Sequence, residues 1–381
     1  MLTRLCLHEP LCRHVVVSLM GRGTYADVLE ARGIRVEALE LTRTGSVIWG
    51  LGRLRRLLRE LQPTVVQTWM YHANLLGGLA ARSIGQRRLV WGIRHSTHEA
   101  ATTRWSTRAV VWACARLSAV VPEQIVCAGE RARAIHQGAG YPAARLISIP
   151  NGLDAVDYAD APETRQRVRA AWGIPPDMPL VGMVARWDPQ KDHRALLDAL
   201  GRVATVGRRF HTVLVGHGVD EVQPALRDAL QVHGLTARVT LAGARRDVPD
   251  ILHALDLHVL SSAYGEAFPN AVLEALAAGV PCVVTDVGDA ALLVGDAGWV
   301  VPPRDPVALA EAITAALDAM RDGPSWQARR AASRARSAPY TLDRMCAAYR
   351  AVWGVADAPS ADVGASSAAT GASPNIASNT R

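Results

Sequence analysis

Short runs of β-branched and other apolar residues alternate along the chain with amphipathic stretches of roughly 10 to 18 residues. In parallel sheets the strands are buried between helices and therefore read as nearly continuous apolar runs. The pattern predicts strands at residues 14–19, 36–41, 64–69, 89–94, 125–129, 146–150, 180–185, 212–216, 238–243, 257–262, 281–286 and 298–302. A joint near residues 150–175 divides them into two sets. This division predicts an α/β chain with two doubly wound, Rossmann-like domains facing a cleft.

The pattern also predicts the boundaries of these parts. The two domains comprise residues 1–155 and 156–340, because a Pro-Asn-Gly sequence at 150–152 interrupts the periodicity at the joint. Residues 341–355 form a predicted amphipathic helix that packs back towards the first domain. Residues 356–381 are rich in Ala, Ser, Gly and Pro and contain almost no large apolar side chain, so we expect a disordered tail.

Charge is distributed unevenly between the two halves. Residues 1–150 contain 20 Arg, no Lys and 9 acidic residues, a net charge of +11, whereas the remaining residues sum to −4 of the total +7. A basic first half favours an anionic partner such as a membrane surface, although an Arg-rich composition alone gives the same excess. The predicted helix at 47–62 places its leucines on one face and its arginines elsewhere. Such a helix either lies on an anionic membrane or covers a sheet with its charged face in water.

Other features of the composition narrow the class of protein. No stretch of 18 uncharged apolar residues is present, and the first residues lack the apolar core of a signal peptide, so we expect a cytoplasmic protein. The six cysteines are scattered, without Cys-x-x-Cys pairs or a His/Cys cluster, and we expect no metal site. The basic half lacks aromatic interleaving and any known nucleic-acid motif, so no nucleic acid is expected as a partner.

The segment SSAYGEAFPNAVLEALAAGVPCVVTDVG at 261–288 carries the strongest chemical signal. A strand ends at its start, and Pro269 opens a helix that stops at Gly279. The helix N-terminus offers free backbone N–H groups and the positive end of the helix dipole to an anion. Glu266 precedes it and Glu274 lies one turn inside, and carboxylates accept hydrogen bonds from vicinal sugar hydroxyls. A phosphate with a polyol on each side, which describes a nucleotide sugar, fits this arrangement.

A second constellation follows the strand at 180–185. Arg186 ends this strand, and Lys191, the sole lysine of the chain, stands just before the next helix. Two cations beside a helix start can neutralise the charge of a diphosphate leaving group. The single lysine, in a chain that otherwise uses Arg, indicates a position where a compact point charge is needed.

Together with IPNGLD at the joint, these motifs resemble glycosyltransferase family 4, the group 1 glycosyltransferases, which have the GT-B fold. The resemblance covers almost the whole chain, and its most specific part is the Glu-(x)7-Glu pattern of Glu266 and Glu274. It implies a metal-independent, anomer-retaining transferase of class EC 2.4 without a cofactor. The first domain would bind the acceptor, and the second would bind a UDP- or GDP-sugar.

The resemblance also implies a role for each matching residue. Glu266 would contact the donor sugar, Glu274 the ribose, and Arg186 and Lys191 the diphosphate. The backbone of Phe268, Pro269 and Asn270 would lie against the phosphates and the sugar. His95, at the carboxyl edge of the strand at 89–94, would reach over the donor sugar from the first domain. The predicted catalytic residues are therefore His95, Arg186, Lys191 and Glu266.

One departure from the family pattern concerns the first domain. The first clear strand, at 14–19, matches the family's second strand, so the domain is expected to lack its first strand and the Gly-Gly loop that follows it. Either the start of the chain was assigned too late, or the chain truly lacks this strand and loop; the first is favoured, because losing a buried parallel strand would expose a large apolar face. In the second case the chain would be an inactive, truncated donor-binding homologue.

Several alternatives remain beside the transferase. A dehydrogenase would need G-x-G-x-x-G after a strand, and no glycine cluster here has the third glycine. A nucleotide-sugar epimerase of the same fold would use much the same donor residues. For a transferase, the basic first half favours a glycan or lipid-linked acceptor in cell-envelope or exopolysaccharide synthesis. Peripheral contact with an anionic membrane at its inner face would accompany that role.

Overall fold

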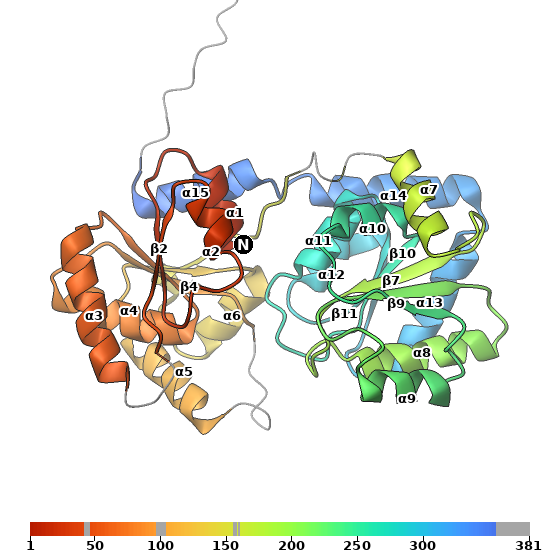
Figure 1. Cartoon of the computed structure of the whole chain (residues 1–381), viewed down its shortest axis with the longest axis horizontal. Coiled ribbons are helices and arrows are strands. Elements are labelled where there is room, and N and C mark those ends of the chain that lie inside the picture. Colours follow the sequence, from red (N-terminus) through yellow and green to blue (C-terminus); the bar gives the residue numbers. More distant parts are fainter. Residues whose placement is uncertain (42–45, 97–103, 155–157, 159–160, 356–381) are drawn as a thin grey trace, which may run out of the picture.

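The computed structural model describes residues 1–41, 46–96, 104–154, 158 and 161–355. Two α/β halves lie side by side along the long axis of the molecule (Figure 1). Each strand predicted from the apolar runs is present, with its ends shifted by one or two residues in most cases. All strand pairs within the sheets are parallel. The predicted α/β class with two Rossmann-like halves is confirmed.

The second half contains one six-stranded sheet in the order β12-β11-β10-β7-β8-β9. Its strands are β7 (Leu180–Val184), β8 (His211–Val215), β9 (Val239–Leu241), β10 (Leu257–Leu260), β11 (Cys282–Thr285) and β12 (Trp299–Val301). The helices are α7 (Pro162–Ala171), α8 (His193–Thr205), α9 (Pro224–Val232), α10 (Val248–Ala254), α11 (Asn270–Ala277), α12 (Ala290–Val294), α13 (Pro306–Ala319) and α14 (Gly323–Ser337). The chain leaves β7 towards β8 and later returns to add β10 on the other side. The carboxyl ends of β7 and β10 therefore form the switch point where open α/β sheets bind ligands.

The first half contains two separate sheets. β1 (Val15–Ser18) pairs only with β2 (Arg35–Ala38) among the described strands. The four others form the sheet β3 (Val66–Trp69), β4 (Leu89–Ile93), β5 (Gln124–Cys127) and β6 (Leu146–Ser148). Within the described residues no strand joins the two sheets, as expected for a domain without a central first strand.

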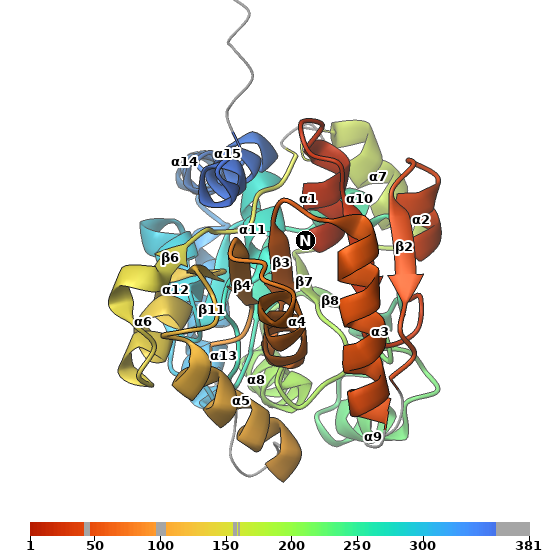
Figure 2. The same cartoon turned by 90° about the vertical axis from the view of Figure 1, so that its left-hand side faces the viewer.

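Six helices accompany these sheets. They are α1 (Leu2–His8), α2 (Ala26–Glu30), α3 (Ser46–Leu61), α4 (Tyr71–Ser83), α5 (Trp105–Leu117) and α6 (Glu130–Gly138). α4 packs against both α3 and α5, so these three form one layer, which faces the viewer in Figure 2. No helix in the described part of the chain is long and apolar enough to cross a membrane.

The last helix, α15 (Leu342–Trp353), returns to the first half of the chain. Its buried face, including Met345 and Tyr349, packs with Val90 and Ile149 from the region of β4 and β6. The Tyr349 ring also stacks on Trp69 at the end of β3, with the ring centroids 5.9 Å apart. This crossover ties the two halves together away from the joint.

Candidate active site

The loops that follow β7 and β10 meet at the switch point of the second sheet. The first loop carries Arg186 and Lys191, and the second contains Glu266 and leads into α11. The Ala263 backbone N–H donates to the Gln190 carbonyl oxygen at 2.8 Å, which holds the two loops together. The site therefore forms where the topology of the sheet predicts a ligand.

Lys191 and Glu266 form an ion pair, and their side chains are only 15% and 8% exposed. Ser262 Oγ donates a further hydrogen bond to Glu266 Oε1 at 2.7 Å. The Lys191 carbonyl oxygen accepts from Ser261 Oγ at 2.9 Å, which fixes the backbone beneath the ammonium. These contacts hold the two predicted residues together in one largely buried pair.

Arg186 lies at the edge of the same site, with a side chain that is 55% exposed. Its Nε donates to Asp188 Oδ2 at 3.0 Å, and its Nη2 lies 3.4 Å from Gln190 Oε1. An exposed guanidinium keeps most of its donors available for an anion. Arg186 and Lys191 therefore both belong to the loop that follows β7.

Two buried histidines, His193 and His258, lie close enough to Lys191 for its charge to act on them. Burial, reinforced by the positive charge of Lys191, lowers the pKa of His193 to about 4 and that of His258 to about 3. Both rings are therefore neutral at neutral pH. Of these three side chains, Lys191 is therefore the one that carries a positive charge and can bind an anion.

The loop that carries Glu266 leads directly into α11. The helix begins at Asn270, with Pro269 as its N-cap residue, one position later than the sequence predicted, and no side chain of the described residues caps it. The Phe268 ring is buried and packs edge-on against Tyr340, with centroids 5.3 Å apart, so this residue offers its backbone. Asn270 Oδ1 accepts from Asn151 Nδ2 at 2.7 Å, which connects the helix start to the joint between the halves.

Glu274 lies one turn inside α11, where its side chain is 12% exposed. Its Oε1 accepts from Arg4 Nη2 of α1 at 2.7 Å. A residue of the first half thus contacts the carboxylate predicted to hold the ribose. Sequence reasoning did not identify Arg4, because no local motif links residues 270 positions apart.

His95 reaches the site from the loop after β4. A Cβ atom added at Gly265, whose φ is +79°, would lie 2.5 Å from His95 Cε1 and 3.3 Å from Gln190 Cδ. The imidazole therefore lies directly on the loop that precedes Glu266. His98, a weaker candidate from the same sequence segment, lies outside the described residues.

A second contact between the halves lies beside this loop. The Asp289 carboxylate accepts from the backbone N–H groups of Glu130 and Arg131, at 2.8 and 2.9 Å, and so caps α6 of the first half. Burial raises the pKa of Asp289 despite these hydrogen bonds. The Asp289 N–H donates to the Ala267 carbonyl oxygen at 3.0 Å, next to Glu266. The contact between the halves is therefore connected directly to the candidate active-site loop.

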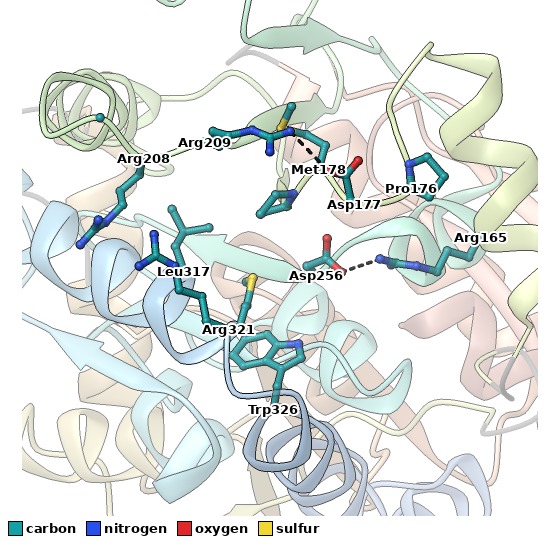
Figure 3. Close-up of a pocket in the computed structure, with 13 residues that line it drawn as sticks. Arg165, Pro176, Asp177, Met178, Arg208, Arg209, Asp256, Leu317, Arg321 and Trp326 are labelled. Carbon is teal, nitrogen blue, oxygen red and sulfur yellow. Dashed lines mark hydrogen bonds and ion pairs between the residues drawn. The ribbon is translucent and has the colours of Figure 1, made fainter.

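A separate pocket lies in the second half, at the ends of the strands opposite to the candidate active site (Figure 3). Its lining includes Asp177, Arg209 and Asp256, which precede strands β7, β8 and β10. Arg165 and Arg209 pair with Asp256 and Asp177 in this lining. This pocket is at the amino ends of the strands and contains none of the predicted site residues. Among the described residues, no group of three His, Cys, Asp or Glu side chains could hold a metal ion.

The fold and site together define a GT-B protein, with two Rossmann-like halves and a cationic site close to where they meet. Residues 7–156 match the family model described as "Glycosyltransferase Family 4", and residues 178–319 match "Glycosyl transferases group 1". The chain belongs to this family of glycosyltransferases.

Three known proteins illustrate the similarity. The chain is 29% identical over 236 residues to the Escherichia coli UDP-Gal:alpha-D-GlcNAc-diphosphoundecaprenol alpha-1,3-galactosyltransferase, a match covering 61% of this chain and 60% of that one. It is 33% identical over 184 residues to the phosphatidyl-myo-inositol mannosyltransferase of Mycobacterium leprae, covering 46% of each chain. The crystal structure of Anabaena HepE with UDP and glucose has a TM-score of 0.80 at 21% identity, covering 92% of this chain and 95% of HepE.

The similarity to curated relatives is partial in length. The matched segments span 36% and 60% of the first two such relatives, EpsF of Bacillus subtilis and the E. coli galactosyltransferase.

Proposed function

We propose that this protein is a retaining, metal-independent glycosyltransferase that moves a sugar from a UDP-sugar to a glycan or lipid-linked acceptor. The observation that carries the proposal is the buried Lys191–Glu266 ion pair at the switch point of the second sheet, in the loop that leads four residues later into the start of α11. The choice of UDP is supported by relatives, since the E. coli relative uses UDP-Gal and HepE was solved with UDP and glucose.

In this proposal the diphosphate lies between the two cations and the start of α11. Lys191 and Arg186 stabilise the negative charge that develops as the bond from the anomeric carbon to the diphosphate oxygen breaks. The backbone N–H groups at Asn270 add the positive end of the helix dipole. This set of donors takes the place of a metal ion at the leaving group.

The two glutamates would hold the sugars on either side of the diphosphate. Glu274 accepts hydrogen bonds from the ribose hydroxyls. Arg4, which donates to the same carboxylate in this structure, then either releases the carboxylate or shares it with the ribose. Glu266 accepts from hydroxyls of the transferred sugar, and its position is fixed by Ser262 and Lys191. His95 covers the sugar from the first half, because its ring lies on the loop before Glu266.

The acceptor then attacks from the face that the diphosphate leaves. A bond forms between the acceptor oxygen and the anomeric carbon, and the proton of the acceptor hydroxyl passes to the departing phosphate oxygen. The configuration at the anomeric carbon is retained. Two relatives have a lipid-linked or lipid substrate in their names, which supports an acceptor of this kind in envelope polysaccharide synthesis at the inner face of the membrane.

A nucleotide screen in the presence of EDTA tests this function. We expect UDP and one UDP-sugar to raise the melting temperature, because a ligand that binds only the folded state stabilises it. Transfer of the radiolabelled sugar to a diphosphate-linked lipid acceptor should follow. If no nucleoside diphosphate shifts the melting temperature, the proposal fails. Conversion of the donor to its epimer without an acceptor would instead identify an epimerase.

A further inference from the structure

The pocket at the amino ends of β7, β8 and β10 takes no part in the proposed transfer (Figure 3). It has a volume of about 540 Å³. The turns before these three strands, the end of α13 and the start of α14 surround it. Pockets that bind small molecules commonly have volumes of roughly 300 to 1,000 Å³. The size of this pocket is therefore that of a small-molecule site.

Part of the pocket lining is apolar. The side chains that share this character are Pro176, Met178, Pro179, Leu317, Met320 and Trp326. Trp326 is only 6% exposed, and its ring stacks on that of Trp299 with the centroids 6.4 Å apart. An indole ring held in this way offers a flat surface on which an aromatic or other apolar group can pack.

The lining also contains four arginines and two aspartates, and one of these arginines has a structural role. Arg165 donates from Nη2 to Asp256 Oδ1 at 2.5 Å and from Nη1 to the carbonyl oxygens of residues 253–255. Asp256 also accepts from Arg169 and from the Leu180 N–H. These hydrogen bonds fix the amino edge of the sheet and occupy most of the donors of Arg165.

The other three arginines of the lining are only partly compensated. Arg208 and Arg321 share one carboxylate, that of Asp318, at 2.8 and 3.6 Å. Arg208 Nε is buried and has no hydrogen-bond partner among the described residues. Arg209 lies 3.4 Å from Asp177, and since both side chains are 70% exposed this pair contributes little. Three guanidinium groups therefore share two carboxylates, which leaves positive charge for an anionic ligand.

We propose that this pocket binds a small phosphorylated molecule that also carries an aromatic or apolar portion. Guanidinium groups bind phosphate oxygens through paired, charge-assisted hydrogen bonds. Arg209 and Arg321 are free to turn towards a phosphate, because their side chains are 70% and 71% exposed. Figure 3 shows Arg209 and Trp326 on opposite sides of the pocket, so a ligand that contacts both needs an anionic end and an apolar end.

Two elements lead from the pocket to the candidate active site. α14, which carries Trp326, packs against α11. A Cβ atom added at Gly279, just after α11, would lie 2.6 Å from Arg334 Cζ of α14, so the two helices are in close contact there. β7 begins directly after Pro179 of the pocket, and its other end leads to Arg186. A ligand that shifts these elements would change the affinity for the donor, and the donor would change the affinity for the ligand by the same factor.

Calorimetric titration of the full chain with 1-naphthyl phosphate tests the binding, because this compound joins one phosphate to one aromatic ring. We expect one site per chain, with an affinity roughly tenfold or more above that of inorganic phosphate, since the ring adds buried apolar area. Uncharged 1-naphthol should bind more weakly than the phosphate ester by a similar factor. The double change Arg209→Gln with Arg321→Gln removes two exposed side chains and should weaken binding roughly tenfold or more.

A matched variant with the same change in charge serves as the control. Arg194→Gln with Arg227→Gln removes two exposed arginines of α8 and α9 that do not line the pocket, and it should bind 1-naphthyl phosphate as the wild type does. Unchanged binding in the Arg209 and Arg321 double variant would overturn the proposal, as would equal affinities for inorganic phosphate and its naphthyl ester. Weaker binding in Lys191→Ala would also overturn it, because the compound would then lie in the candidate active site.

UDP titrations with and without 1-naphthyl phosphate separate this inference from the proposed function, on which only the coupling rests. In the wild type the UDP affinity should change by about fivefold or more, and in the Arg209 and Arg321 double variant it should not change. The same UDP affinity with and without the compound in the wild type would contradict the coupling. Normal UDP binding without binding of the compound would reject only the pocket. Absence of UDP binding would reject the transferase, while the titrations with 1-naphthyl phosphate would still decide whether the pocket binds a ligand.

Discussion

Lys191 illustrates how one residue acquires its role from its surroundings. Its ammonium is held against Glu266 at a site where His193 and His258 are kept neutral by burial. A flexible cation is thereby fixed at the place where the departing diphosphate would develop charge. Its position depends on contacts with residues 75 positions away, which the sequence could suggest only through the resemblance.

We predict that Lys191→Ala lowers kcat by roughly 100-fold, because it removes a positioned cation from the leaving group. Steady-state transfer kinetics would measure the effect. Arg194→Ala, at an exposed position near the start of α8, should retain nearly normal activity. A near-normal kcat for Lys191→Ala would exclude its role in the chemical step.

The buried histidines predict how stability depends on pH. The pKa of His193 is about 4 in the folded protein, against an ordinary value of 6.5, so below pH 6.5 the unfolded chain binds more protons. The free energy of unfolding should therefore fall as the pH drops, by roughly 2 kcal/mol from pH 6.5 to 5 for this residue. Denaturant titrations at both pH values would measure the change. His193→Gln should flatten the dependence and the exposed His217→Gln should not; equal slopes in all three proteins would contradict the account.

At the scale of elements, the strands could be predicted almost completely from the sequence. Parallel strands buried on both faces, such as β4 with its fully buried Leu89, Trp91 and Ile93, appear as continuous apolar runs. The start of α11 could be placed within one residue because Pro269 and Gly279 bracket the helix. The loops bearing Arg186, Lys191 and Glu266 then follow from strand order, since carboxyl ends of parallel strands meet at one edge.

Contacts between distant elements could not be predicted in the same way. Arg4 on α1 and Asp289 before α12 belong to no local motif, and their partners are 270 and about 159 positions away. The two tryptophans of α5, Trp105 and Trp112, differ from these, because their spacing is visible in the sequence. Their exposure could not be predicted, because a periodic apolar face is ordinarily buried and the structure shows this one in contact with solvent.

At the scale of the molecule, the position of one half over the other depends on a few polar contacts. The Asp289 carboxylate caps α6 of the first half, and the Asp289 N–H donates to the Ala267 carbonyl oxygen. The contact between the two halves is therefore coupled to the shape of the candidate active-site loop. The Asn151–Asn270 hydrogen bond and the Arg4–Glu274 pair are further contacts between the halves or at their joint. Such contacts would align His95 with the donor sugar.

We predict that Asp289→Ala lowers kcat/KM about tenfold, because the lost cap destabilises the aligned arrangement by an amount typical of helix N-caps. Small-angle scattering should show a larger radius of gyration in the absence of ligand. Asp286→Ala, which removes only the half-exposed pair with Arg131, provides the control and should change neither quantity. Unchanged kinetics and scattering for Asp289→Ala would show that this contact does not position the halves.

The central claim is that α11 and the loops beside it hold a nucleoside diphosphate, and calorimetric titration with UDP tests it most directly. Because Glu274 would accept from both ribose hydroxyls, Glu274→Ala should weaken UDP binding by roughly 10- to 100-fold. Glu311→Ala, an exposed carboxylate on α13, should leave the affinity unchanged. Equal UDP affinity for wild type, Glu274→Ala and Glu311→Ala would contradict the account.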